Sequence, residues 1–238
     1  EVKMNEGNNK QFKAAGGIGL ISSRLTLEGP IVKEKGSFIV SARRTYIDVF
    51  MKQFIKPSSS FSGTSYYFYD FNAKFNYNIG KKDKLYLSGY YGKDFFNFGN
   101  KEDDFIVKMP WGNAIASLKW THLFSNKLFM NTSLNFTDYL FSFGSSQENF
   151  NIEIKSGIRD MGGKVDFTYY PNNRHNMKWG VDYLHHKFTP VSISASQDTT
   201  VFDTGLAQNL YSHESAIYFL DEVDLNEFIR INVGLRYS

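Results

Sequence analysis

The chain has 238 residues, of which 17% are aromatic and none is cysteine, and its formal net charge is +3. Its mean hydropathy is -0.38, and it has no run of about 20 apolar residues, which excludes a protein that crosses a membrane with helices. Because the charge is small and evenly spread, we expect no nucleic-acid partner.

The first half of the chain predicts β-strands. We expect strands over Gln11–Leu20 and Arg24–Ile31, followed by the clearest pattern, which runs from Tyr67 to Ile79. There apolar and polar residues alternate almost without exception, as in a strand with one apolar and one polar face. After the polar break Gly80–Asp83 the alternation resumes, which indicates a hairpin of two long strands. Hairpins of this length with aromatic residues on the apolar side are typical of transmembrane β-barrels.

The second half continues this pattern. Leu128–Thr137, Met177–Leu184 and Ile229–Tyr237 alternate in the same way. Glycines interrupt Phe150–Tyr170 and indicate a bulge or bend there, and the alternation slips over Ala216–Val223. In total we expect roughly eleven strands, an odd number, although single-chain bacterial barrels have an even number. Aromatic residues close to the short turns predict a girdle at the periplasmic side of a barrel: Tyr77, Trp120, Tyr169, Trp179 and Phe228.

Short and long connections alternate along the chain, and in outer-membrane barrels the short turns face the periplasm and the long loops face outward. The expected short turns are Val32–Gly36, Gly80–Asp83, Ser125–Lys127, Pro171–His175 and Leu225–Glu227, all rich in turn-forming residues. The expected long connections are Thr45–Ser65, Phe96–Trp111, Phe143–Asn151 and Pro190–His213.

Two sets of side chains are candidates for a functional surface. The polar strand faces supply lumen-facing candidates, which either contact a ligand or simply hydrate the lumen: Arg43, Asp70, Asn72, Lys74, Asn76, Lys119, Asn131, Asn135, Lys164, Asp166, Lys178, Asp182, Arg230 and Arg236. The outer loops supply aromatic candidates, which either stack on a ligand or only pack the loops: Tyr66, Phe68, Phe95, Phe98 and Trp111.

We expect neither a metal site nor a cofactor. His185 and His186 are adjacent on a predicted strand, so their side chains point to opposite faces and cannot bind one ion together. No nucleophile elbow, zinc-protease motif or phosphate-binding loop occurs, which argues against an enzyme. Three alternatives stay open: an outer-membrane barrel hydrolase, a small passive channel or structural barrel, and a soluble β-sandwich.

Five segments resemble one family. They are SRLTLEGPI (Ser23–Ile31), SFIVSARRTY (Ser37–Tyr46), YYFYDFNAKFNY (Tyr66–Tyr77), SGYYGKDFF (Ser88–Phe96) and DEVDLNEFIRINVGLRYS (Asp221–Ser238). Together they resemble TonB-dependent outer-membrane receptors of the Bacteroidetes type, in which a plug domain precedes a barrel of 22 strands. The resemblance implies an all-β fold, an antiparallel transmembrane β-barrel segment of about 11 strands.

The same resemblance implies a division of the chain. Residues 1–9 would hold the end of the plug domain and a linker, because Glu1–Gly7 is similar to the plug exit of the family. Residues 10–238 would form the N-terminal half of the barrel, which explains the odd strand count. Arg43 and Arg44 would then pair with carboxylates of the plug or bind an anionic ligand, with one of them at most pointing into the lumen.

The function implied by the resemblance is active import across the outer membrane of a Gram-negative cell. The family takes up a scarce nutrient, of the siderophore, glycan, peptide or cobalamin class, with proton-motive force delivered by TonB. The implied partners are outer-membrane lipid and lipopolysaccharide, the TonB–ExbB–ExbD complex through a region N-terminal to these residues, and a surface lipoprotein of the SusD-like kind. The chain would not be an enzyme.

Overall fold

The computed structural model describes residues 4–54, 56, 59, 62–100, 104–198, 200–203 and 208–238. These residues form one antiparallel sheet and one short helix, α1 (Ile47–Phe54). None of the helices in the described ranges is long and apolar enough to cross a membrane. The strands are β1 (Lys13–Ile18), β2 (Ser22–Val32), β3 (Gly36–Thr45), β4 (Ser65–Ile79), β5 (Asp83–Asn100), β6 (Phe105–Ser125), β7 (Leu128–Gln147), β8 (Phe150–Tyr169), β9 (His175–Gln197), β10 (Thr200–Asp203), β11 (Leu210–Asp224) and β12 (Arg230–Tyr237).

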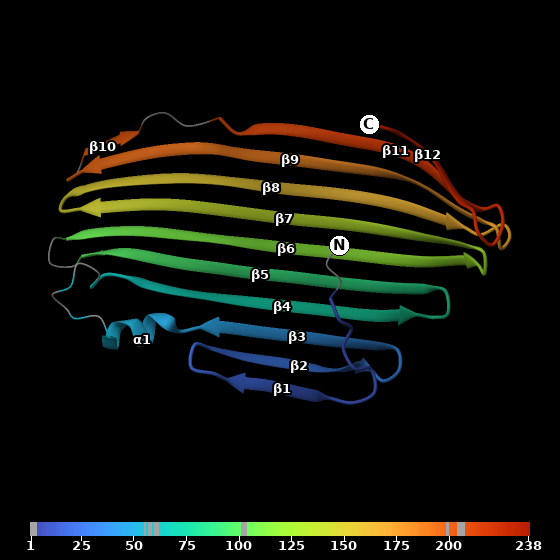
Figure 1. The fold of residues 1–238 in the computed structure, drawn as a ribbon, viewed down its shortest axis with the longest axis horizontal. Coiled ribbons are helices and arrows are strands. Elements are labelled where there is room, and N and C mark those ends of the chain that lie inside the picture. The colour runs from blue at the N-terminus through green and yellow to red at the C-terminus, as the bar shows by residue number, and fades with distance from the viewer. Residues whose placement is uncertain are drawn as a thin grey trace.

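The strands follow one another through the sheet in chain order, with β10 pairing only with β9. Figure 1 shows that the hairpin connections alternate between two ends of the sheet. We call the end with the β2–β3, β4–β5, β6–β7, β8–β9 and β11–β12 connections the turn end, and the opposite end, where α1 lies, the loop end. All five expected short turns lie at the turn end, so this part of the sequence prediction is confirmed.

Three of the four expected long connections are wrong. β5 continues to Asn100 and β6 starts at Phe105, so most of Phe96–Trp111 is strand, and β7 and β8 leave only two residues between them. Likewise, β9 and β10 fill much of Pro190–His213. The sequence pattern ends early because polar side chains on both faces remove the alternation, whereas backbone pairing continues whatever the side chains are. Only Thr45–Ser65, which contains α1, is a long connection as expected.

The glycines in β8 mark one irregularity in the sheet, as expected. Between Lys155 and Gly157 the pairing with β9 shifts, because Ser192 and Thr189 are their partners and β9 therefore carries one extra residue. This is the geometry of a β-bulge, which bends the strand locally. Elsewhere β8 pairs with β9 without a break, but the extra residue reverses the alternation on β9, so that Ser192 lies on the same face as Thr189.

The sheet has one apolar face that no second layer covers. The row Phe75, Leu87, Leu118 and Leu134 runs straight across four strands, and these side chains are 37% to 55% exposed. Among the described residues Ala216 is the only buried hydrophobic residue. A soluble β-sandwich would bury such a face against a second sheet, and the described part of the chain contains none.

The apolar face has the height of a lipid bilayer. In β5 it extends from Asp83 to Lys93, two charged residues on the same face and ten positions apart. At about 3.3 Å per residue and a strand tilt of about 40°, this distance corresponds to about 25 Å along a barrel axis. Outer-membrane barrels expose an apolar band of about this height. The expected girdle residues Tyr77, Trp120 and Trp179 lie on this face close to the turn end.

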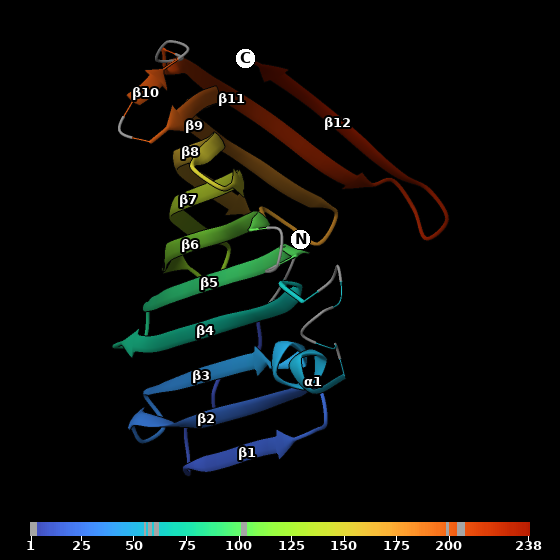
Figure 2. The ribbon, with the colours of Figure 1, turned by 90° about the vertical axis from the view of Figure 1, so that its left-hand side faces the viewer.

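The sheet is curved. Figure 2, seen from the loop end, shows β11 and β12 turning away from the central strands toward the side on which the N-terminal segment lies. We call this side the concave face and the apolar side the convex face. The described residues leave β1 and β12 each with one unpaired edge. In hydrocarbon every unpaired backbone group costs several kcal/mol, so both edges would need a pairing partner in a membrane.

Candidate functional site

The register of the sheet places all of the lumen-facing candidates on the concave face. One row crosses seven strands and contains Asn76, Tyr86, Lys119, Ser133, Lys164, Asp182 and Ala216. Side chains an even number of residues apart on one strand share a face, and so do direct partners on neighbouring strands. By these two criteria the other candidates lie on the same face as this row. This single polar face is therefore the candidate functional surface.

Arg43 and Asp70 form an ion pair on this surface. They are direct neighbours across β3 and β4, and Nε and Nη2 of Arg43 both lie 2.7 Å from Oδ2 of Asp70. The Asp70 side chain is only 10% exposed. Its partner among the described residues thus lies on the next strand, and the pairing with a plug carboxylate stays a prediction. Arg44 points to the convex face, over the ring of Tyr67.

The aromatic candidates divide between the two faces. The Tyr66 hydroxyl donates to Asp94 at 2.9 Å, and the rings of Tyr66 and Phe68 are 6.2 Å apart on the concave face. Trp111 lies opposite Asp94 on the same face. Phe98 also faces this side, four residues beyond Asp94 on β5. Phe98 and Trp111 were expected in the long connection Phe96–Trp111, but the structure has them in β5 and β6.

Phe95 is the exception among the aromatic candidates. It lies on the convex face, where its ring stacks on Tyr67 with centroids 4.8 Å apart. The ammonium group of Lys93 lies 5.1 Å from the centre of the same ring. Neighbouring residues on a strand point to opposite faces, so Phe95 cannot share a surface with Phe68 or Trp111. The prediction of one common aromatic patch is wrong for this residue.

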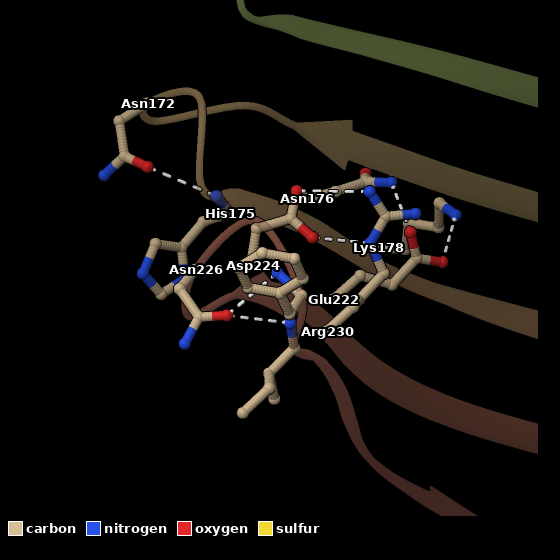
Figure 3. A network of polar contacts seen from close by, with 10 residues as sticks. Asn172, His175, Asn176, Lys178, Glu222, Asp224, Asn226 and Arg230 are labelled. Carbon is tan, nitrogen blue, oxygen red and sulfur yellow. Dashed lines mark hydrogen bonds and ion pairs between the residues drawn. The ribbon is translucent and has the colours of Figure 1, made fainter.

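A second polar cluster lies at the turn end of the concave face, between β9, β11 and β12 (Figure 3). Glu222 accepts hydrogen bonds from Asn176 at 2.9 Å and from Lys178 at 3.0 Å. Arg230 donates to Asp224 at 2.5 Å across the last hairpin. This hydrogen bond to Arg230 lowers the pKa of the Asp224 carboxyl below its ordinary value. The cluster keeps the charges of this hairpin balanced.

A hollow of about 560 Å³ lies beside this cluster. Five of the lumen-facing candidates line it: Asn131, Lys164, Asp166, Lys178 and Arg236. Lys164 forms an ion pair with Asp166 at 3.2 Å, and its ammonium group lies 5.2 Å from the centre of the Tyr218 ring. The charged side chains of the lining are thus more often positive than negative, and apolar side chains line the rest. The structure therefore brings a subset of the candidates together in one place.

The N-terminal segment lies across the concave face. Lys74, which is 9% exposed, donates from Nζ to the carbonyl oxygen of Met4 at 2.8 Å. Glu6 lies 3.5 Å from Nζ of Lys84. Gly7 approaches the backbone of Phe38 so closely that an added Cβ would lie 2.0 Å from the carbonyl oxygen. A side chain at this position would therefore push the segment off the sheet.

The adjacent histidines His185 and His186 lie on opposite faces of the sheet. His186 contacts Asp160 at 2.7 Å on the concave face, whereas His185 packs against His213 on the convex face with ring centres 4.6 Å apart. The two adjacent histidines thus point to opposite faces, as the strand geometry predicts. No group of three or more His, Cys, Asp or Glu residues suited to a metal ion occurs among the described residues.

Sequence reasoning missed two anchoring carboxylates of this surface. Asp94 was overlooked because it lies close to Phe96, where the strand was expected to end. It is four residues from Tyr90 on the same strand, so the alternation would have placed it on the polar face. Glu222 lies where the alternation was judged to slip, yet β11 pairs without a break from Leu210 to Asp224. For Glu222 the pairing partners carry the information, whereas the alternation within β5 would have been enough to place Asp94.

Comparison with known proteins reveals similarity in structure alone. No protein-family profile matches the chain, and no curated protein matches its sequence. The ferric yersiniabactin uptake receptor FyuA from Yersinia pestis superposes with a TM-score of 0.58 at 12% identity, over 94% of this chain and 40% of the receptor. The siderophore receptor PiuA from Acinetobacter baumannii gives 0.57 at 10% identity, over 98% and 43%.

The chain has the fold of part of a TonB-dependent receptor barrel. Its antiparallel sheet of about 12 strands matches part of the 22-stranded barrels of these receptors, and it spans about two fifths of their length. The outer-membrane protease OmpT from Escherichia coli matches with a TM-score of only 0.31, too low to indicate a common fold. The solved structures thus support the expected fold class.

Proposed function

We propose that these residues form part of the barrel wall of a TonB-dependent outer-membrane receptor, which imports a scarce nutrient with energy from the proton-motive force. The nutrient would belong to the siderophore, glycan, peptide or cobalamin class. The protein is then a multi-pass β-barrel of the outer membrane, with the loop end outside the cell. Its relation to receptors of the Bacteroidetes type is part of the proposal.

The observation that carries this proposal is the contrast between the two faces of one long-stranded sheet. The convex face carries an apolar band of about 25 Å, the height of a bilayer core in barrels. The concave face carries the charged and amide side chains and holds the N-terminal segment through Lys74. The structural match to about two fifths of two uptake receptors supports the same conclusion.

In this proposal the concave face lines the lumen, and its polar side chains contact water, a plug domain or the ligand. Residues 1–9 would be the end of that plug and its linker, and residues 10–238 the first half of the barrel. TonB–ExbB–ExbD would act through a plug N-terminal to these residues. Outer-membrane lipid would cover the convex face, and a SusD-like lipoprotein would be a further partner at the loop end.

A passive channel is the main alternative, and a barrel hydrolase is the second. A passive channel would use the same two faces but would need no energy source. A hydrolase would need a nucleophile, base and acid near one another. The solved structures that match are uptake receptors, so the favoured function is transport.

The first test of the proposal is the mass of the native full-length protein. An antibody against these residues should detect, in the outer-membrane fraction of the native organism, a band far above the 27.4 kDa of this chain. The expected band reflects a complete plugged barrel. A band near 27.4 kDa would instead favour a small self-contained barrel, and a band in the soluble fraction would refute the membrane assignment.

Energy dependence is the second test. A strain that lacks the gene should lose growth on one limiting nutrient from a panel of iron chelates, glycans, peptides and cobalamins. Deletion of tonB should abolish growth on the same nutrient, because import then has no energy source. If growth in the tonB strain persists and still depends on this gene, the protein is a passive channel.

A further inference from the structure

The convex face carries an unusual row of side chains where its apolar band ends toward the loop end. Asp138 of β7, Arg159 of β8, Lys187 of β9 and Tyr211 of β11 are direct cross-strand neighbours in that order. All four therefore share one face and lie side by side. Two of the four are cations that face each other directly.

The row contains more positive than negative charge. Arg159 donates from Nη2 to Oδ2 of Asp138 at 3.0 Å and from Nε to Oδ1 at 3.3 Å. Lys187 has no hydrogen-bond or ion-pair partner among the residues that the structure describes. Like charges directly opposite each other across two strands destabilise a sheet. An anion held between Arg159 and Lys187 would remove this repulsion.

At the other boundary of the apolar band, two carboxylates lie beside histidines. Near the turn end, Asp83 contacts His122 at 2.6 Å, and Asp221 contacts His175 at 2.8 Å. Each of these carboxylates thus has its own partner on the neighbouring strand. The excess of positive charge therefore lies at the loop-end boundary of the band, where the strands continue beyond it.

Further cations lie at the same boundary on other strands. The guanidinium group of Arg44 lies 5.5 Å from the centre of the Tyr67 ring, and the ammonium group of Lys93 lies 5.1 Å from the centre of the Phe95 ring. All of these side chains point outward from the convex face. Cations beside aromatic side chains are typical of the membrane interface, where the polar headgroup of a lipid meets its hydrocarbon chains.

The surface below the row is suited to hydrocarbon. Six residues from Lys187 toward the turn end, Val181 is 50% exposed, and its neighbour Ile217 is 59% exposed. Leu134, four residues from Asp138 on β7, is 55% exposed. A ligand that bridges the cationic row and this surface must be anionic at one end and apolar over the rest. A phosphorylated membrane lipid has both properties, whereas a free anion has only the first.

We propose that Arg159 and Lys187 bind the phosphate group of a lipid headgroup in the leaflet at the loop end. The guanidinium group contributes fixed donors, and the unpaired ammonium group of Lys187 contributes a mobile charge. The acyl chains lie along the exposed apolar side chains below, and Tyr211 lies at the edge of the headgroup. This proposal rests on the proposed function, since it assumes that the convex face meets lipid.

The test compares lipid binding by purified native protein and by the double variant Arg159→Gln/Lys187→Gln. Lipid A with its phosphates is added to the protein in detergent, and bound lipid is counted by native mass spectrometry. We expect at least about a tenfold loss of affinity, because a charge-assisted contact is worth about 1.5–3 kcal/mol. The matched control is Lys119→Gln/Lys164→Gln, which removes the same charge from the concave face and should bind lipid as the wild type does.

Each outcome decides the proposal. Unchanged affinity of the double variant, or an equal loss in the control, overturns it, as does equal binding of dephosphorylated lipid A. Competition by inorganic phosphate alone would indicate a free-anion site instead of a lipid site. If the double variant fails to fold, Lys187→Gln carries the test, since Lys187 holds no described residue in place. Fractionation and growth assays test the transport function separately. A failure of the lipid-binding proposal can therefore be distinguished from a failure of the proposed transport function.

Discussion

A charge placed on the convex face should destabilise the membrane-inserted protein far more than the same charge one residue away. Leu134 and Asn135 are neighbours on β7 and point to opposite faces, with Leu134 on the convex side and 55% exposed. Replacing each by arginine changes the net charge identically. Only the environment of the new side chain differs between the two variants.

The depth of Leu134 sets the size of the effect. It lies four residues from Asp138, the charged residue at the loop-end boundary of the band. This separation is about 13 Å along the strand and about 10 Å along the axis of a tilted barrel, which places Leu134 near the middle of a band about 25 Å high. An arginine at the midplane of a barrel costs about 2–4 kcal/mol, or about 30- to 700-fold in the folding equilibrium.

Asn135→Arg should cost about 1 kcal/mol. Its main loss is the hydrogen bond that Ser117 donates to Asn135 at 2.7 Å on the exposed concave face, and such a bond contributes about 0.5–1.5 kcal/mol. The measurement is a urea titration of the native protein in lipid vesicles, followed by tryptophan fluorescence. Equal unfolding free energies of Leu134→Arg and Asn135→Arg would refute the assignment of the convex face to lipid.

Three further predictions concern polar contacts. Arg43→Ala should lower the unfolding free energy by about 1–3 kcal/mol, since it leaves the largely buried Asp70 unpaired, and adding Asp70→Ala should recover part of the loss in the same titration. Because the pKa of Asp224 is lowered in the folded protein, its contact with Arg230 stabilises above the ordinary carboxyl pKa and is lost as pH falls through the lowered value. Asp224→Asn should therefore reduce stability at neutral pH and have no effect in strong acid. Lys74→Met should release the N-terminal segment, measured as faster proteolysis before residue 10; an unchanged rate would show that Lys74 does not hold it.

Strand alternation predicted the turn-end half of the sheet well. Tyr67–Ile79 has one apolar face and one polar face. Such alternation assigns each side chain to one face of the strand without knowledge of the neighbouring strands. The candidates of the concave face therefore fell on a single side, from Arg43 to Arg236. The five short turns were equally predictable, since their glycine, proline and polar residues leave the chain few other conformations.

The alternation could not predict which residues lie opposite each other on neighbouring strands. Asp70 was expected to line the lumen and Arg43 to meet a plug carboxylate, yet the register puts the two side by side. Asn76 was expected to face the lumen freely, but it is 6% exposed and donates to Ser37 at 2.6 Å. These contacts depend on which residue of the next strand lies opposite, and that is set by the turn length and the pairing of whole strands.

The sequence by itself therefore determined the fold class, the two faces and the turns, because a side chain's preference for lipid or water acts locally and repeats every second residue. The tertiary structure alone decided the length of the loop-end hairpins, the ion pairs and the contact of the N-terminal segment with Lys74. Beyond the apolar band both faces meet water, so the alternating signal vanishes there while backbone hydrogen bonds continue to join the strands.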